Sequence, residues 1–375
     1  MSASSPSANC VLVTGATGYI AQHVCQQLLD AGYRVKGTVR SLQSEKARYA
    51  LGPNLFGPYG DAFTAVQANL ASNEGWSDAA QGCRFVCHVA APVPKGAGYL
   101  SDFSMVETTV SGVENVLGAC AGQVERVVMT SSIAAISMPN GLRSDPFDDA
   151  APPLTEADWT NLETDPTKLS AYSVAKTSAE RRAWRLVAEL PEANRFELVT
   201  INPSIVVGPV LSPYVAASVE ILSLLAAGKL PALAGCPLPA PHVDVRDVAQ
   251  AHVTALTKPE AAGKRYLLHD DHYDMHQLFA ELGPELTEQG FRMPKSRIPL
   301  WLMRFLAWFS GDVKALMHTL GPATGRVRRA DGSLATRELG ITYRPILDAY
   351  RDTLHSLIAR GVTKGPRGYL PPSKS

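Results

Sequence analysis

The chain has 375 residues, of which 46% are hydrophobic and 19% are charged, a composition typical of a folded protein with a sizeable core. Lysine plus arginine and aspartate plus glutamate number 35 each, which argues against a broad nucleic-acid-binding surface. The length favours one large domain with a smaller appended lobe. No nucleic-acid partner is therefore expected.

The sequence gives no sign of secretion, of a zinc site or of a membrane span. Residues 1–9 have neither a basic start nor an apolar stretch, and they are predicted to be a disordered lead rather than a signal peptide. Of the six cysteines, only Cys83 and Cys87 lie close together, and no second pair completes a zinc site. Residues 300–309 are too short for a membrane span. We expect reduced thiols, no metal and a cytoplasmic location.

Strand-like and helix-like segments alternate through the first two thirds of the chain. This order predicts right-handed crossovers and a doubly wound parallel (Rossmann) sheet of the α/β class. The predicted strands are Cys10–Thr14, Tyr33–Val39, Phe63–Val66, Phe85–Ala90, Val127–Thr130 and Leu198–Ile201. The main predicted helices are Tyr19–Leu29, Val106–Cys120 and Tyr172–Leu190.

The pattern changes after Pro203, where prolines and glycines become frequent. A strand–helix unit at His242–Leu256 is predicted to return to the sheet, and the chain beyond it is rich in helix. We therefore predict a Rossmann domain made of 10–207 plus 240–260. The remaining residues, 208–239 plus 261–365, are predicted to form a smaller, helix-rich substrate-binding lobe.

Small residues stand at the turn from the first predicted strand into the first helix. Gly15 permits a tight turn, Gly18 lets the backbone approach a pyrophosphate, and Ala21 allows the helix to pack closely on the sheet. The helix N-terminus adds amide donors and a positive dipole. This context predicts a dinucleotide site. The alternative is a glycine-rich turn without a ligand.

The end of the second predicted strand carries cations where an NAD-selective site would offer an acid, about 20 residues after the glycines. Arg40 stands there, and Lys46 follows shortly after. A guanidinium can stack on adenine and bind a 2′-phosphate through two hydrogen bonds. NADP(H) is therefore the predicted cofactor, and a solvated strand end is the alternative.

Tyr172 and Lys176 stand four residues apart, on one face of a predicted helix. A phenol with a pKa of about 10 exchanges protons poorly at neutral pH, and a nearby lysine cation lowers that pKa. By itself, the pair is equally compatible with a solvated helix surface. Upstream, a strand ends at Ser131 and Ser132, on the edge where doubly wound sheets bind ligands. One of these serines can orient a substrate carbonyl, and spacing does not separate them.

Several sequence motifs, spread over roughly residues 10–265, together resemble those of a known family. They are Val13–Ile20, Gly37–Arg40, Gly82–Cys83, His88–Pro92, Thr130–Ser132, Tyr172–Glu180, Asn202–Pro209 and His242–Ala249. A weaker match lies at Leu339–Pro345. In these motifs the chain resembles the extended short-chain dehydrogenases/reductases. Within them it is similar to the dihydroflavonol 4-reductase and cinnamoyl-CoA reductase group, which includes microbial aldehyde and ketone reductases.

The resemblance implies a role for each matching residue. Tyr172 is implied to be the proton donor, Lys176 its activator and the anchor of the nicotinamide ribose, and Ser132 the hydroxyl that orients the carbonyl. Tyr172 and Lys176 are also implied to contact the cofactor. The other implied cofactor contacts are Gly15, Thr17, Gly18, Tyr19, Ile20, Arg40, Lys46, Asn69, Leu70, Val89, Ala90, Ala91, Thr130, Pro203, Ser204, Ile205 and Val206.

Two positions depart from the family pattern. Asn69 stands where this group commonly has aspartate, which alters the expected adenine contact. Residues 133–137 lack the polar residue that plant flavonoid reductases use for ring hydroxyls, which argues against a flavonoid substrate.

The leading hypothesis is an NADPH-dependent reductase of a small hydrophobic aldehyde or ketone, acting as a monomer or homodimer. The apolar residues after Pro203 favour such a substrate: Leu211, Tyr214, Val215, Ile221, Leu222, Leu224 and Leu225. A 3β-hydroxysteroid dehydrogenase or a nucleotide-sugar epimerase would share the Tyr–Lys pair, but Arg40 favours NADP(H). An NADP(H)-sensing regulatory protein is the alternative without catalysis, and such proteins generally lose the pair.

Other conspicuous residues are expected to be structural. Three histidines are predicted to lie in the core or at strand ends rather than to bind metal: His88, His242 and His252. Asp244 and Asp247 are predicted to cap or anchor a helix that begins near Arg246. Four aromatic residues are spaced to line one helix face, and ordinary packing is the expected role: Trp301, Phe305, Trp308 and Phe309.

Overall fold

The fold is seen in a computed structural model of the chain. The structure describes residues 7–92, 102–137, 152–163, 169–215, 217–227, 239–291 and 329–371, and also positions 293, 299, 301, 302, 305 and 308. Within them, no helix is long and apolar enough to cross a membrane.

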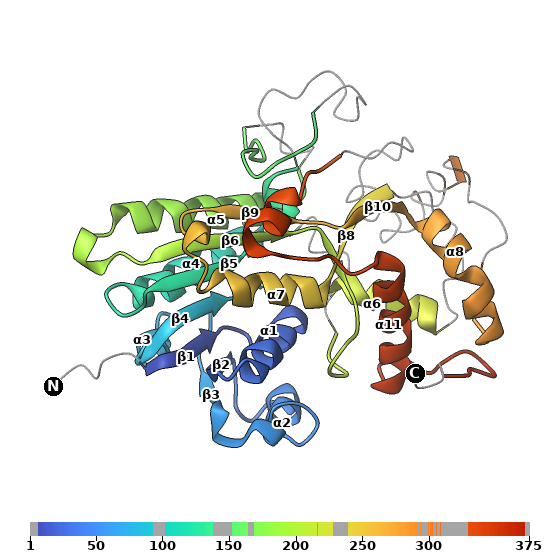
Figure 1. The fold of residues 1–375 in the computed structure, drawn as a ribbon, viewed down its shortest axis with the longest axis horizontal. Coiled ribbons are helices and arrows are strands. Elements are labelled where there is room, and N and C mark those ends of the chain that lie inside the picture. Colours follow the sequence, from blue (N-terminus) through green and yellow to red (C-terminus); the bar gives the residue numbers. More distant parts are fainter. Residues whose placement is uncertain are drawn as a thin grey trace.

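A seven-stranded sheet forms the centre of the molecule (Figure 1). Its spatial order is β3-β2-β1-β4-β5-β6-β9, and every neighbouring pair is parallel. The strands are β1 (Ser7–Val13), β2 (Arg34–Val39), β3 (Phe63–Gln67), β4 (Cys83–His88), β5 (Arg126–Thr130), β6 (Glu197–Pro203) and β9 (Arg265–Leu268). The strand order reverses between β1 and β4, so the predicted doubly wound parallel sheet is confirmed, and ligands are expected at the carboxyl ends near this reversal.

Helices cover both faces of this sheet, with α1 and α7 on one face and α4 and α5 on the other (Figure 1). The helices are α1 (Tyr19–Asp30), α2 (Glu45–Leu51), α3 (Trp76–Ala80), α4 (Ser104–Cys120), α5 (Ala171–Glu189), α6 (Ala217–Ala226), α7 (Val245–Ala255), α8 (Met275–Glu288) and α11 (Ile346–Ala359). The three main helices predicted from the sequence are thus present, with ends within a few residues of the expected ones.

Alternating side chains of the strands build two cores. Val11 and Val13 of β1 lie in the core beneath α1 and α7, whereas Leu12 lies in the core beneath α4 and α5. All three side chains are buried, because a parallel sheet covered on both faces places successive residues in opposite apolar layers. The continuous apolar run at the start of the chain follows from this arrangement.

A second, three-stranded sheet in the order β10-β8-β7 lies beside α6, α8 and α11 (Figure 1). Its strands are β7 (Ile205–Val207), β8 (Pro239–Asp244) and β10 (Asp271–Asp274). The sequence expectation that the strand near His242 returns to the main sheet is therefore wrong. Its following helix, α7, does return, and β9, from the range assigned to the smaller lobe, takes the edge position beside β6. The domain boundaries themselves stay a prediction.

The first strand begins earlier than the sequence indicates. Ser7 pairs with Cys83 of β4, so residues 7–9 belong to a strand and not to the predicted disordered lead. Backbone pairing needs no apolar side chain, which explains why the Ser-Ala-Asn stretch gave no signal. Five cysteines are free and buried, as expected: Cys10, Cys25, Cys83, Cys87 and Cys120.

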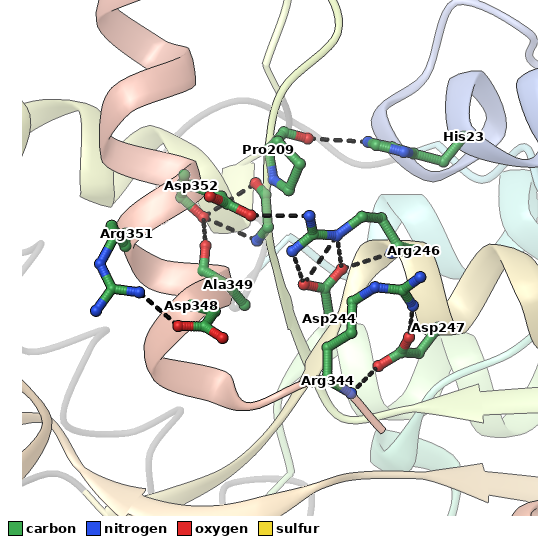
Figure 2. Close-up of polar contacts among 12 residues, drawn as sticks. His23, Pro209, Asp244, Arg246, Asp247, Arg344, Asp348, Ala349, Arg351 and Asp352 are labelled. Atoms are coloured by element: carbon green, nitrogen blue, oxygen red, sulfur yellow. Dashed lines mark hydrogen bonds and ion pairs between the residues drawn. The ribbon is translucent and has the colours of Figure 1, made fainter. Parts of the chain in front are cut away.

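Asp244 ties β8, α7 and α11 together (Figure 2). Its carboxylate caps α7 by accepting from the Arg246 amide at 2.7 Å, and it also pairs with the Arg246 guanidinium at 2.6 Å. That guanidinium reaches Asp352 of α11 at 2.8 Å. Asp247, in the first turn of α7, accepts from the Arg344 amide at 2.8 Å. The predicted helix cap and anchor are therefore confirmed.

Asp244→Ala is expected to lower the free energy of unfolding by about 2–3 kcal/mol, because it removes the helix cap and leaves Arg246 without its buried partner. Asp348→Ala on α11 is the matched control, since its pair with Arg351 is exposed and contributes about 0–1 kcal/mol. Urea denaturation measures both. Equal losses in the two variants would contradict this role of Asp244.

Candidate active site

The glycine loop joins the end of β1 to α1 and lies against the end of β4. Gly15 has a φ of +68°, which favours glycine, and a side chain there would stand 2.9 Å from the Ala90 Cβ. Gly18 precedes α1, and no side chain of the described residues caps the helix there. The first amides of a helix lack intrahelical partners, so this turn offers donors to an anion.

The ends of β1 and β4 are bonded to each other through Thr14. Its hydroxyl accepts from the amides of Val89 and Ala90 at 3.0 and 2.9 Å, and it also bonds His88 Nδ1 at 2.9 Å. The predicted ribose stretch, Val89 to Ala91, is therefore held directly beside the glycine loop.

Arg40 directly follows β2 and is exposed. No carboxylate of the described residues pairs with its guanidinium, and β2 is joined to the glycine loop where the Ala16 amide donates to the Thr38 carbonyl at 2.9 Å. Arg40 is thus two residues from a direct contact with that loop. The Lys46 ammonium instead lies 5.5 Å from the centroid of the Tyr214 ring, a cation–π contact. Its predicted part in holding a phosphate stays a prediction.

Asn69 and Leu70 follow β3 at the same edge of the sheet. The Asn69 side chain accepts from the Ala71 amide at 3.2 Å, and its residue is exposed. Leu70 lies under α4, where Asn115 donates to its carbonyl at 2.9 Å. Both residues belong to the edge at which the cofactor is predicted, and their contact with it stays a prediction.

Tyr172, Lys176 and Ser132 come together at the carboxyl ends of β5 and β6. Ser170 caps α5 by accepting from the Ser173 amide at 3.1 Å, which starts the helix at this edge and places Tyr172 in its first turn. The Lys176 Nζ is 6.0 Å from the centroid of the Tyr172 ring and 3.4 Å from the Thr130 carbonyl oxygen. The Ser132 side chain lies close enough to Tyr172 to lower the pKa of its phenol.

The two serines that spacing could not separate have different partners. The Ser131 hydroxyl donates to the Glu180 carboxylate at 2.5 Å, beneath the site. The Ser132 hydroxyl contacts Tyr172 and accepts from the Ala134 amide at 3.1 Å. This geometry favours Ser132 as the serine that faces a substrate carbonyl.

Burial dominates the protonation of the Tyr–Lys pair. It raises the pKa of Tyr172 above its usual value, and the Ser132 hydrogen bond lowers it only in part. The sequence prediction that Lys176 lowers the pKa of Tyr172 is therefore wrong in sign: the pKa is raised because desolvation of the phenolate outweighs the other contributions. Burial lowers the pKa of Lys176 to about 8, against the charge of Glu180, which raises it.

The histidines are buried and hydrogen-bonded or packed, as predicted. Burial, together with the Lys176 cation, lowers the pKa of His88 to about 3. His252 bonds the Thr130 hydroxyl at 2.6 Å, and burial lowers its pKa to about 4. The His242 ring packs edge-on against Tyr350. Among the described residues, no group of three histidine, cysteine or acidic side chains is placed to hold a metal ion.

The end of β6, the residue after it and the start of β7 complete this edge with Pro203, Ser204, Ile205 and Val206. Tyr19 of α1 bonds the chain directly after β7 by donating its hydroxyl to the Gly208 carbonyl at 2.8 Å. Ser204 is only 7% exposed, and within the described part of the chain its hydroxyl has no hydrogen-bond partner. An unpaired buried hydroxyl at a ligand edge is a group that a polar ligand can satisfy.

Two expectations about apolar residues are corrected. Trp301, Phe305 and Trp308 are 69%, 54% and 87% exposed, so ordinary core packing is wrong for them, and Phe309 lies outside the described residues. Leu222 and Leu225, expected near the substrate, are instead buried in the core. Helical spacing identifies a shared face but does not tell whether a neighbour covers it.

The residues directly beneath the site have no role predicted from the sequence. Glu180 is fully buried and bonds Ser131 directly after β5, Asn202 of β6 and Arg265 of β9. The available signal was the spacing of Tyr172, Lys176 and Glu180, which places a third polar residue on the same helix face. No local pattern pointed to Arg265, because its pairing with Glu180 spans 85 positions.

Residues 11–268 match the model of the NAD dependent epimerase/dehydratase family. The chain is 35% identical to cinnamoyl-CoA reductase 1 of Arabidopsis thaliana over 285 residues, which cover 75% of this chain and 77% of the relative. The fold is similar to that of yeast methylglyoxal/isovaleraldehyde reductase Gre2 complexed with NADPH, with a TM-score of 0.72, 24% identity and coverage of 93% and 98%. Gre2 of Candida albicans in complex with NADPH gives 0.69, 25% identity and coverage of 94% and 99%.

Lys176→Met is expected to stabilise the fold at pH 7 by on the order of 3 kcal/mol. Because its pKa in the fold is about 8, below the ordinary value of 10.5, protonated Lys176 costs stability at neutral pH. That cost fades as the pH rises from about 8 past 10.5, so the gain from methionine shrinks over the same interval. Urea titrations at pH 7 and pH 10.5 measure the effect.

Lys258→Met is the control, because Lys258 is exposed and its change is expected to stay within about 0.5 kcal/mol. A Lys176→Met variant less stable than the unsubstituted protein at pH 7 would show that burying the protonated lysine does not lower the free energy of unfolding.

Proposed function

The chain belongs to the NAD dependent epimerase/dehydratase family, and from this premise we propose that it reduces the carbonyl of a hydrophobic aldehyde or ketone with Tyr172 as proton donor. In coarser terms, it is an NADP(H)-dependent oxidoreductase of the extended short-chain dehydrogenase/reductase type. The observation that carries the proposal is the meeting of Ser132, Tyr172 and buried Lys176 at the ligand edge of the sheet.

The residues at this edge fit NADP(H). The Gly15 turn leaves no room for a side chain next to Ala90, and the start of α1 offers amides to a pyrophosphate. Arg40 is exposed where a 2′-phosphate would be recognised, and the Ser204 hydroxyl is available to a polar group. The cofactor would supply the hydride.

The protein's own groups would manage the carbonyl and the proton. Ser132 and Tyr172 would both donate hydrogen bonds to the carbonyl oxygen, which fixes its position and polarises it. As negative charge develops on that oxygen, Tyr172 would transfer its hydroxyl proton to it. A phenol whose pKa is raised stays protonated at neutral pH, and an alkoxide is basic enough to take its proton. Lys176, as a cation, would stabilise the phenolate that remains and hold the ribose of the cofactor.

The substrate class rests on the relatives and on apolar surface. Cinnamoyl-CoA reductase and methylglyoxal/isovaleraldehyde reductase are named for carbonyl substrates. In this chain, the exposed rings of Trp301, Phe305 and Trp308 offer apolar surface in the region predicted for the substrate lobe. An anionic sugar nucleotide would need fixed cations around its diphosphate, and the sequence between 208 and 241 supplies no such cluster.

Arg40→Ala is expected to narrow the preference for NADPH over NADH by about 1.5–3 kcal/mol, the contribution of a charge-assisted contact. Fluorescence titration with each cofactor measures this difference. Arg34→Ala on the same strand is the control, because Arg34 lies at the opposite end of β2 from the predicted phosphate site. Equal affinity of the unsubstituted protein for the two cofactors would contradict NADP(H) selection by Arg40.

Tyr172→Phe is expected to lower kcat by on the order of 10²-fold or more with little change in NADPH affinity, because it removes the proton and keeps the ring. NADPH oxidation with a panel of aldehydes, ketones, flavanonols and sterols measures kcat. Near-normal turnover in this variant would move the chemistry away from Tyr172. Turnover of a sugar nucleotide alone, without reduction of any hydrophobic carbonyl, would favour an epimerase.

A further inference from the structure

The carboxylate of Glu180 is fully buried on α5, one turn after Lys176, and side chains of three neighbouring strands converge on it. From the end of β5, Ser131 donates to Oε2 at 2.5 Å. From β6, Asn202 donates to Oε2 at 2.8 Å and Thr200 to Oε1 at 2.9 Å. From β9, Arg265 Nε donates to Oε1 at 2.7 Å. A buried charge needs such partners, so this carboxylate fixes the three strands relative to α5.

The same bonds reach the residue that faces the carbonyl. The Asn202 side-chain amide that bonds Glu180 also donates to the Ser132 carbonyl oxygen at 3.2 Å. Ser131 is held at its hydroxyl by Glu180 and at its amide by the Ile201 carbonyl, at 2.7 Å. The turn that carries Ser132 is therefore fastened on its buried side through Glu180.

Arg265 links the hydrogen bonds around Glu180 to residues 156–160. Its Nη1 donates to the carbonyls of Glu156 and Asp158, both at 2.6 Å, and its guanidinium carbon lies 3.7 Å from the centroid of the Trp159 ring. Thr160 then bonds back to the chain just after Ser132, with its hydroxyl 2.8 Å from the Ala134 carbonyl. Arg265 is thus held in place by contacts other than its ion pair.

Glu180 is also the carboxylate whose charge acts on Lys176. In the part of the chain that the structure describes, the other titratable groups around Lys176 are Tyr172 on the same helix, His88 at the end of β4 and His252 on α7, which bonds Thr130. Burial lowers the pKa of both histidines to about 3 and about 4, so they are neutral throughout the range in which Lys176 titrates.

We propose that Glu180, with Arg265 as its counter-ion, is a positioning residue of the reductase site: it fixes the Ser131–Ser132 turn and supplies the buried negative charge that faces Lys176. This proposal rests on the proposed function, because it assigns Glu180 its effect through Ser132 and Lys176. Glu180 itself has no exposed surface and acts without touching the substrate.

Glu180→Gln separates this role from a merely structural one. Loss of the charge lowers the pKa of Lys176 further. NADPH affinity and kcat are both expected to fall at high pH as Lys176 deprotonates, and this alkaline limb of each pH profile is expected to move to lower pH by about one unit. At a pH above the limb, either quantity is expected to be up to about tenfold lower than in the unsubstituted protein. Fluorescence titration and turnover between pH 6 and pH 10 measure the two limbs. Glu189→Gln, which removes an exposed carboxylate from the same helix, is expected to leave both unchanged.

Two further variants keep the test independent of folding. If circular dichroism shows that Glu180→Gln is unfolded, the double variant Glu180→Gln/Arg265→Met removes both buried charges and is expected to show the same shift. Ser131→Ala retains both charges and removes one anchor. It is expected to lower kcat about five- to tenfold with the limb in place, the effect of one lost hydrogen bond.

An alkaline limb that does not move in the folded charge-removing variant would overturn the electrostatic role, even if activity fell uniformly. Full kcat in Ser131→Ala would overturn the role in positioning Ser132. Absence of carbonyl turnover in the unsubstituted protein would contradict the proposed function alone, because the comparison of NADPH-binding limbs uses no turnover.

Discussion

A carboxylate without exposed surface must find its hydrogen-bond donors inside the protein, and Glu180 finds them directly after β5 and on β6 and β9. This requirement joins the edge strand of the main sheet to the helix that carries Tyr172 and Lys176. It also explains why a buried ion pair stands beneath a site that needs a fixed geometry. Removing one partner of such a pair leaves an uncompensated charge, so the strands, the helix and the proposed catalytic side chains depend on one another for their positions.

The reversal of strand order between β1 and β4 determines where the two halves of the site meet. The glycine loop lies on one side of the reversal, and the Ser132 turn follows β5 on the other side. Thr14 bonds the first half to the chain after β4, and Lys176 bonds Thr130 at the end of β5. A dinucleotide bound across this edge would therefore reach from the exposed Arg40 to the Tyr172 phenol, which is the layout that a hydride transfer to a bound carbonyl requires.

Residues whose meaning is local were predictable from the sequence. The glycine turn, the Tyr–Lys spacing and the helix cap at Asp244 each depend on a few neighbouring positions, and strand ends followed from runs of apolar residues. Contacts between distant residues were not predictable in this way: the join of Glu180 to Arg265 and the edge position of β9 arise only when the sheet closes. Likewise, Ser7 belongs to a strand because of backbone pairing, and Trp308 is exposed because no neighbour covers it among the described residues.

The central claim is that this edge transfers hydride from NADPH to a carbonyl while Tyr172 supplies the proton. Reduction of a hydrophobic aldehyde with NADPH that carries deuterium at both C4 positions tests it most directly, with the product analysed by mass spectrometry and NMR. The account predicts one deuterium on the carbinol carbon for each NADPH consumed. Failure to transfer deuterium to any aldehyde or ketone, together with conversion of a sugar nucleotide without net consumption of cofactor, would contradict it.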